Sequence, residues 1–298
     1  MTRKNIKIKI ELSKRIFCFY ALLNFLDYNP EASSIHPMRK KVRIFLKHTI
    51  PGKDFKDSKE IIKQEDLRKE FWFPLRTWIL CHGQPPNFIE KSCYWKKFLD
   101  IQTGKEFCQQ LKSFWKLVFP LWKIIRRDYS KIIQKCLSNA KIAVESSLSY
   151  LRLKKTDIKE FIVIPNFLEE YDRGIGPKIG KSAYALLGPS IGNDPFPVRR
   201  IQHEFLHSII NPMTHDVLGN IVKKGELSLI REYLIHAIIL RSHRFNKLYY
   251  KNKITTLKKL KFKNIEKVLV ILKDYELSQK NFREFVRNNK IKIKKACL

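Results

Sequence analysis

The chain has 298 residues, of which 44% are hydrophobic, with 60 Lys and Arg residues against 28 Asp and Glu residues. This length and composition suit one large or two modest folded domains and exclude a disordered chain. The formal net charge of +32 favours acidic partners such as nucleic acid or an anionic membrane. A compositional bias toward Lys and Ile at surface positions would produce the same excess.

Cysteine spacing and hydropathy bear on the location of the protein. The six cysteines form no C-x-x-C pair, so we expect free thiols in a reducing compartment. No apolar run reaches about 18 residues, so no transmembrane helix is predicted. Residues 16–26 have the length of a signal-peptide core, but a long basic stretch precedes them, Asn24 interrupts them and no A-x-A site follows. We expect a cytoplasmic protein in which this run is a buried helix, with secretion as the less favoured alternative.

The first half of the chain is predicted to be mainly helical. Residues 5–11 alternate apolar and charged side chains, which predicts a strand with one solvated face. Helices are then expected over residues 13–27, 36–48, 60–80 and most of 91–152. Pro120 should break or kink the last of these. Aromatic side chains at helical spacing are expected in the core, namely Phe71, Trp72, Phe73, Trp78, Trp95, Phe98, Phe107, Trp115 and Trp122.

The character of the sequence changes near residue 157. Residues 158–165 and 182–189 are candidate strands, and five of the ten glycines fall between 174 and 192. Such a concentration indicates turns and places where the backbone approaches another group closely. Asp194-Pro195 then offers an N-cap followed by proline at the first helical position. The helix that starts there should end at Asn211-Pro212.

The remaining elements complete a predominantly helical α+β fold. Another helix is expected from about 226 to 243, and the tail over 245–298 is helical, with 14 Lys and 2 Arg against 4 acidic residues. We therefore predict a small sheet packed on a central helix. The expected parts are a helical N-terminal region at 1–157, a core at 158–243 and a basic helical tail at 244–298.

The segment HEFLH at residues 203–207 carries the strongest chemical signal. His203 and His207 are one helical turn apart, so both imidazoles can bind a single ion. Glu204 lies about 100° round the helix, where it can reach a water molecule better than the ion. H-E-x-x-H supplies the two nitrogen ligands and the general base of zinc hydrolysis. Core histidines satisfied by hydrogen bonds are the alternative. A third histidine six residues after the motif, another known arrangement, is absent because Met213 stands there.

A second helix offers the third ligand. Residues 226–241 are apolar nearly all round, so this helix should be buried, and Glu232 and His236 stand one turn apart within it. A buried carboxylate without a cation is costly, which predicts Glu232 as the third zinc ligand. An ordinary ion pair with Arg231 or Arg241 is the alternative. His236 could orient a ligand or stabilise an oxyanion.

These two motifs resemble those of the gluzincins, a class of zinc metallopeptidases. The resemblance lies in H-E-x-x-H on one helix and, after 24 intervening residues, E-x-x-x-H on a second helix. Gluzincins often have Asp at the last position, where this chain has His236. The segments HEFLHSIINP and EYLIHAI also resemble a bacterial group of predicted metallopeptidases whose domain has no known function. The resemblance covers residues 158–243.

The resemblance implies one zinc ion held by His203, His207 and Glu232, with Glu204 as base and proton shuttle. It also implies that a peptide substrate pairs with an edge strand just before the active helix, a place that residues 182–187 fit. The oxyanion donor would be a histidine or tyrosine, and the candidates are Tyr233, His236, His215 and His243. The other histidines, at positions 36, 48 and 82, are interpreted as ordinary surface or loop residues.

Three functions remain open at this point. The favoured one is a zinc-dependent metallopeptidase acting on a peptide or protein substrate, with Glu204, His236 and Tyr233 as candidate catalytic residues. The second is a basic protein associated with nucleic acid or another acidic partner, with a structural or secondary zinc site. The third is an interaction module that binds zinc without catalysis, which would not need Glu204. The sequence does not predict an oligomeric state.

Overall fold

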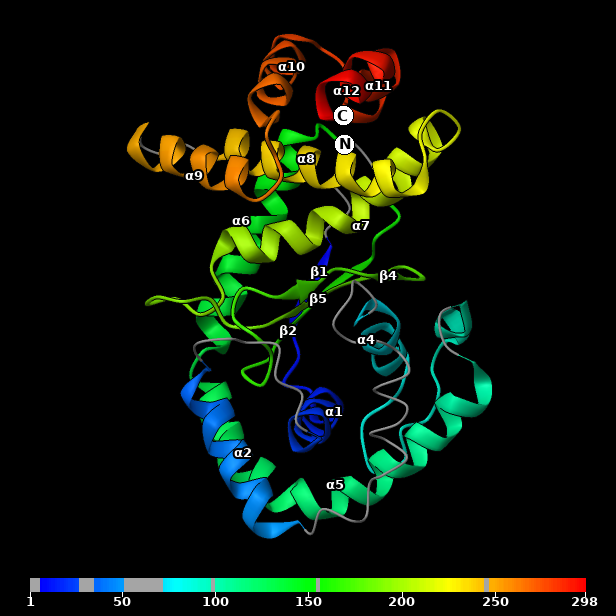
Figure 1. Ribbon diagram of the computed structural model, residues 1–298, viewed down its shortest axis with the longest axis vertical. Helices are drawn as coiled ribbons and strands as arrows, with labels where there is room; N and C mark the ends of the chain where they lie inside the picture. The colour runs from blue at the N-terminus through cyan, green and yellow to red at the C-terminus, as the bar shows by residue number, and fades with distance from the viewer. Residues whose placement is uncertain (1–5, 27–34, 51–71, 98–99, 154–155, 244–246) are drawn as a thin grey trace.

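The structure is a computed structural model that describes residues 6–26, 35–50, 72–97, 100–153, 156–243 and 247–298 (Figure 1). Within these residues eleven α-helices and a five-stranded mixed sheet form an α+β fold, which confirms the predicted fold class. None of the described helices combines the length and the hydropathy that a membrane span needs.

The sheet is small and mainly parallel at its centre. β1 (Lys7–Ile10), β2 (Glu160–Pro165) and β5 (Ser182–Leu187) run parallel in that order. β3 (Gly174–Ile175) and β4 (Lys178–Ile179) pair antiparallel with the outer side of β5. All three predicted strands are confirmed. The N-terminal strand lies directly beside β2, although about 150 residues separate them in the sequence.

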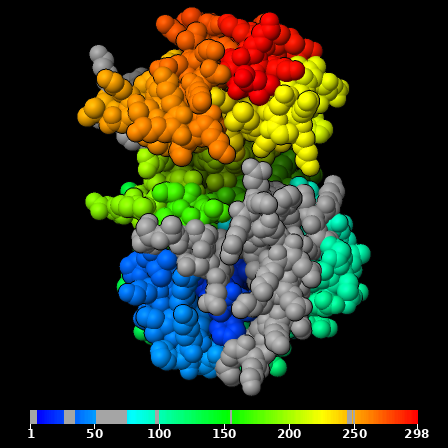
Figure 2. Space-filling model, viewed as in Figure 1, coloured from blue at the N-terminus to red at the C-terminus, as the bar shows by residue number. Residues whose placement is uncertain are grey.

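The helices before β2 are α1 (Lys14–Phe25), α2 (Pro37–Thr49), α4 (Trp72–Leu80), α5 (Ile101–Ser130), α6 (Ile133–Tyr150) and the short 3-10 helix η1 (Cys93–Lys97). All but α6 lie on one side of the sheet, and α6 runs past the sheet to pack on α7 and α8 (Figure 1). The helices after β5 are α7 (Val198–Leu218), α8 (Lys224–Ser242), α9 (Lys247–Lys259), α10 (Ile265–Leu277), α11 (Phe282–Asn288) and α12 (Lys290–Cys297). Figure 2 shows α9 to α12 as a layer at one end of the molecule, with α2 at the other.

Helix α1 is the buried helix that the hydropathy predicts. The hydroxyl of Ser13 caps its first turn by accepting a hydrogen bond from the backbone N–H of Ile16. Every residue from 16 to 23 is at most 2% exposed. Helices α2, α4 and α5 pack around it, so this segment forms the centre of the N-terminal layer.

Aromatic side chains fill that layer as predicted. The confirmed members of the core are Trp78, Trp95, Phe107, Trp115 and Trp122. Phe71 and Phe98 lie outside the described residues, and so do the side chains of Trp72 and Phe73. All six cysteines are free thiols, and Cys93 is the exposed one.

A second core lies between helices α7 and α8 and the C-terminal helices. Buried side chains of α8 pack against α10 and α12 as well as against α7. Leu257 of α9 and Tyr275 of α10 belong to this core. The basic tail is therefore helical, as expected, and its apolar face covers α8.

Two prolines lie inside helices that they were expected to interrupt. Helix α5 continues through Pro120, and α7 continues through Pro212 to Leu218. A proline removes one backbone donor, and Arg231 of α8 supplies hydrogen bonds at this place. Its guanidinium donates to the carbonyl of Asn211 at 3.1 Å and to the hydroxyl of Thr214 at 2.9 Å. The predicted end of α7 is wrong because tertiary contacts stabilise the turn around the proline.

The predicted start of α7 is also wrong, by three residues. The helix begins at Val198, with Pro197 at the N-cap position. Asp194 has another role, because its carboxylate accepts hydrogen bonds from the side chain of Asn139 and from the backbone N–H of Phe196. These bonds hold the loop before α7 against α6.

Candidate metal centre

Four polar side chains from helices α7 and α8 converge where the two helices pack together. The Nε2 atoms of His203 and His207 lie 3.1 Å apart. Glu232 places one carboxylate oxygen 3.5 Å from His203 Nε2 and the other 3.2 Å from His207 Nε2. His236 Nε2 lies 3.9 Å from the nearer oxygen of Glu232. Two residue pairs at i and i+4 spacing on facing helices thus form one cluster.

This cluster has the composition and spacing of a metal site. Donor atoms of His203, Glu232 and His236 lie within 4.8 Å of one another, so these residues could hold a metal ion. His207 is closer still to His203 and Glu232. Donors about 2.1 Å from a tetrahedral zinc ion lie about 3.4 Å from one another. The contacts among His203, His207 and Glu232 fall at 3.1, 3.2 and 3.5 Å, and two different oxygens of Glu232 make the last two. These separations are compatible with such an ion.

The histidines of the cluster are suited to bind a cation. Burial lowers the pKa of His203 well below its ordinary value and lowers that of His236 to about 3. Both imidazoles are therefore neutral at neutral pH, and a neutral imidazole is the form that binds metals. Neither ring supplies positive charge to balance the Glu232 carboxylate beside it.

The alternative of an ordinary ion pair for Glu232 does not hold. Arg231 donates its hydrogen bonds to Asn211 and Thr214 of α7, and Arg241 pairs with Glu276 of α10. The ionisable partners that the structure gives Glu232, among the residues it describes, are the three histidines.

Asn211 orients one of the histidines. Its side-chain oxygen accepts a hydrogen bond from Nδ1 of His207 at 3.3 Å. With the proton on Nδ1, Nε2 of His207 carries the lone pair that faces Glu232 and His203. The residue one turn beyond the motif therefore fixes the tautomer that a metal would need.

Glu204 lies beside the cluster in a tight enclosure. The residue is 3% exposed, and burial raises the pKa of its carboxyl above the ordinary value. The backbone of β3 crosses directly over it. A Cβ added at Gly174 would lie 2.8 Å from Glu204 Oε1, and one added at Gly176 would lie 2.2 Å from its carbonyl oxygen. The predicted close backbone approach in the glycine-rich segment is thus confirmed at Glu204.

The remaining oxyanion candidates lie in different surroundings. The hydroxyl of Tyr233 contacts the connection between α9 and α10, where it accepts a hydrogen bond from the backbone N–H of Asn264 at 3.2 Å. His215 is exposed further along α7. Nε2 of His243 lies 2.6 Å from the side-chain oxygen of Gln202. Of these four candidates, His236 is the one whose side chain the structure records within 4 Å of the Glu232 carboxylate.

Two of the three histidines expected at the surface have structural roles. His82 lies in the loop after α4 but is 4% exposed, and its Nδ1 lies 2.7 Å from the carbonyl oxygen of Trp78, so its interpretation as a surface residue is wrong. His36 caps α2 and stacks on Phe167. His48 is exposed, as expected.

Strand β5 lies just before α7, as expected, but its outer side is not free to pair with a substrate. β3 pairs with its C-terminal end, β4 pairs with its N-terminal end, and the N–H of Tyr184 between them donates to the carbonyl of Pro177. The expectation of an open edge at residues 182–187 is therefore wrong. The glycine-rich segment folds back along β5 and covers it.

A cavity of about 360 Å³ opens beside the histidine cluster. Its lining residues are Asp172, Arg199, Arg200, His203, His236, Ile239, Leu240, Lys253, Thr256, Leu257 and Leu260. The sequence did not indicate the part that α9 plays here, because Lys253 is one of many lysines in the tail. The adjacent arginines at the start of α7 were the available signal, because the first turn of a helix normally favours acids.

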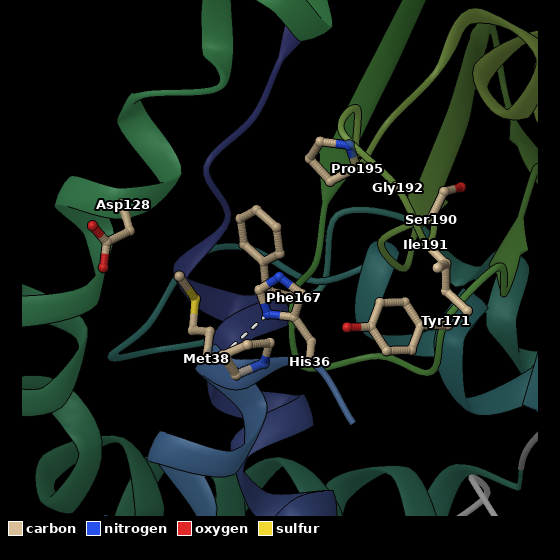
Figure 3. A pocket seen from close by; sticks show the side chains of 10 residues that line it. His36, Met38, Asp128, Phe167, Tyr171, Ser190, Ile191, Gly192 and Pro195 are labelled. Atoms are coloured by element: carbon tan, nitrogen blue, oxygen red, sulfur yellow. Dashed lines mark hydrogen bonds between the residues drawn. The ribbon is translucent and has the colours of Figure 1, made fainter. Parts of the chain in front are cut away.

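A second cavity, of about 400 Å³, lies elsewhere in the molecule (Figure 3). His36, Phe167 and Tyr171 contribute aromatic rings to it, and Asp128 contributes a carboxylate. None of the four residues of the histidine cluster (His203, His207, Glu232 and His236) lines this cavity. Its aromatic wall is explained by the capping of α2 and by the packing of the segment that follows β2.

Comparison with protein-family models, with curated proteins and with solved structures gives no match to this chain.

Proposed function

We propose that the protein is a zinc-dependent metallopeptidase of gluzincin type, with His203, His207 and Glu232 as the zinc ligands. The observation that carries this proposal is the position of Glu232. Its two carboxylate oxygens lie 3.2 and 3.5 Å from the two motif histidines, and no arginine pairs with it among the described residues. A carboxylate and two imidazoles form the donor set of a catalytic zinc site, and Glu204 is the neighbouring acid.

The neighbouring residues have defined tasks in this proposal. A zinc ion at the centre would act as a Lewis acid toward the scissile carbonyl and would make a water molecule more acidic. Glu204 takes the proton of the attacking water and delivers it to the leaving amine. Its raised pKa makes it a stronger base than an exposed glutamate. His236 donates a hydrogen bond to the oxyanion. Tyr233, whose hydroxyl is engaged at the α9–α10 connection, positions α8.

Zinc content and peptide cleavage, measured on the same set of purified proteins, test this proposal. The wild type should hold one zinc ion and cleave members of a mixed peptide library. His203→Ala and Glu232→Ala should lose or strongly weaken zinc binding. Glu204→Gln should keep zinc and lose activity by at least about 100-fold, because proton transfer by a positioned group contributes on that order. His236→Gln should keep zinc and lower kcat.

The control is His215→Ala, which removes an exposed histidine from the same helix and should leave zinc content unchanged. Absence of zinc from a folded wild type supplied with the metal would overturn the proposal. So would full activity of Glu204→Gln. Loss of zinc in His236→Gln would make His236 a fourth protein ligand, and the closed site that results would be structural rather than catalytic.

A further inference from the structure

Positive charge concentrates in the cavity beside the metal centre. Arg199 and Arg200 of α7 and Lys253 of α9 line it together with His203 and His236. One carboxylate, that of Asp172, lines it too. The hydroxyl of Ser190 donates a hydrogen bond to that carboxylate at 2.8 Å. Three cationic side chains and one acid therefore line a cavity that two histidines of the cluster, His203 and His236, also line.

The arginines of this cavity stand at an unfavourable place for helix stability. They occupy the first turn of α7, where the helix dipole is positive and the helix has no acidic residue. The Nε and Nη2 atoms of Arg200 are buried and have no hydrogen-bond acceptor within the described part of the chain. Buried guanidinium donors without acceptors are costly. An anion in the cavity would accept these hydrogen bonds.

Lys253 brings a third cation to the same place from a different layer of the fold. Burial, followed by the positive charges of Arg199 and Arg200, lowers the pKa of Lys253, and Asp172 only partly opposes the shift. Holding this ammonium beside two guanidinium groups raises the energy of the unliganded protein. A negative ligand would relieve that repulsion.

The rest of the cavity wall is apolar. Ile239 and Leu240 of α8 and Leu257 and Leu260 of α9 contribute to it. Within about 360 Å³ a cationic region, an apolar wall and the metal centre meet. This combination suits a peptide residue that carries both an apolar part and a negative group.

We propose that this cavity binds a carboxylate of the peptide substrate, next to the bond that is cleaved. The proposal rests on the proposed peptidase function. The carboxylate has two sources, the α-carboxylate of a peptide C-terminus or the side chain of Asp or Glu. Arg200 and Lys253 bind it by charge-assisted hydrogen bonds, and the apolar wall holds the adjoining side chain.

Binding to the zinc-loaded Glu204→Gln protein tests the proposal without requiring turnover. The probes are three octapeptide libraries of the same mixed sequence. One has a free C-terminal carboxylate and no acidic residue, the second has a C-terminal amide and no acidic residue, and the third has the amide and one Glu. Mass spectrometry would quantify the peptides retained on immobilised protein.

Either the first or the third library, each of which carries a carboxylate, should be retained about tenfold more strongly than the second library, which has none. This factor is expected for charge-assisted hydrogen bonds. Preference for the first library identifies the C-terminal α-carboxylate, and preference for the third identifies an acidic side chain. Equal retention of all three overturns the proposal.

Lys253→Gln, introduced into the same background, should abolish the preference. It should also raise the melting temperature of the unliganded protein, because it removes a partly buried ammonium that two arginines repel. Replacing a lysine with a purely structural role would lower the melting temperature, so a higher melting temperature together with a lost preference distinguishes the two roles. Lys251→Gln removes the same charge from an exposed position on the same helix and should keep the preference. A preference that survives Lys253→Gln contradicts the proposal.

Cleavage of the same libraries by the wild type separates this proposal from the proposed function. Cleavage with equal rates for all three libraries would support the peptidase and refute the carboxylate site. Selective retention without cleavage would support the carboxylate site and refute the peptidase.

Discussion

At the scale of single residues, two glycines determine how closely the segment that contains β3 approaches Glu204. Gly174 faces the carboxylate of Glu204, and Gly176 lies against its backbone. A side chain at either position would have to displace α7 or β3. The glycines thus allow Glu204 to be enclosed without being moved away from His203 and His207.

Gly176→Ala should therefore destabilise both the fold and the metal centre. The new Cβ would lie 2.2 Å from the carbonyl oxygen of Glu204 and 2.8 Å from its carbonyl carbon, and a helix backbone cannot yield as a flexible side chain can. We expect a loss of about 1–3 kcal/mol in the free energy of unfolding and weaker zinc binding. Chemical denaturation and zinc titration measure the two effects.

Gly225→Ala is the matched control. Its added Cβ meets no atom within 4 Å, and it lies in the first turn of α8, where alanine is favoured by up to about 1 kcal/mol. If the two alanine variants were equally stable, the close approach at Gly176 would have no energetic consequence.

The histidine cluster shows what a sequence can and cannot predict at this scale. His203, His207, Glu232 and His236 were identified because i and i+4 spacing within a helix is a local property. That Glu232 faces the motif histidines was predicted from the cost of burying a carboxylate, and this premise was only partly right, because the side chain is 32% exposed. Lys253 could not be identified, because its position depends on how α9 packs on α8, and nothing in its local sequence distinguishes it from other lysines.

At the scale of elements, helix α8 connects the candidate metal centre to the C-terminal layer. Its buried side chains pack against α7 on one side and against α10 and α12 on the other. The sequence predicted the existence of these helices, because their apolar periodicity is strong. It did not predict the ends of α7, where Pro197 is the N-cap and Leu218 the last residue. Both ends depend on hydrogen bonds from distant residues such as Asn139 and Arg231.

The pair between Arg241 of α8 and Glu276 of α10 should make the attachment of these helices dependent on pH. Arg241 holds the pKa of Glu276 below its ordinary value of 4.5, and the hydroxyl of Tyr150 adds a hydrogen bond. Arg152 faces the same residue and donates to its backbone carbonyl. A depressed folded-state pKa contributes stability above the ordinary value, and this stability is lost as the pH falls through the folded-state pKa.

Glu276→Gln should thus lower the free energy of unfolding by about 1 kcal/mol at pH 7, a value that allows for partial exposure of the pair. The difference from the wild type should disappear as the pH falls well below 4.5. Denaturation curves across this pH range measure it. Glu266→Gln on the same helix removes an exposed pair with Lys258 and should change stability by less than about 0.5 kcal/mol. A difference in the free energy of unfolding that does not change with pH would show that the Arg241–Glu276 ion pair is not its cause.

At the scale of the whole molecule, repulsion among the positive charges destabilises the compact fold. A net charge of +32 repels itself in a compact structure. The C-terminal helices carry much of that charge, yet their buried faces cover α8. Deleting residues 245–298 would therefore expose α8 and is not a clean test of nucleic-acid binding. Charge-neutralising substitutions at exposed lysines are the better test.

Salt should stabilise the protein. Raising the NaCl concentration from about 0.01 to 0.3 M shortens the Debye length from about 30 Å to below 8 Å and should weaken the repulsion among the surface cations. We expect the melting temperature to rise by roughly 3–5 °C, as differential scanning calorimetry would show. KCl at equal ionic strength should give the same rise, since screening does not depend on the identity of a monovalent cation. A melting temperature that is constant or falls would mean that the surface charges do not repel appreciably in the folded state.

The pairing of β1 with β2 has a consequence during synthesis. Residues 7–10 find their partners at residues 160–163, which leave the ribosome roughly 8–30 s later at typical translation rates. Throughout that interval β1 has no strand to pair with, and the sheet cannot form until the middle of the chain has been synthesised. α7 and then α8 follow, so the histidine cluster is the last part of the sheet-and-helix core to assemble. A ribosome stalled between β1 and β2 would carry an N-terminal layer without a sheet, and such nascent chains should depend on chaperones more than the finished protein does.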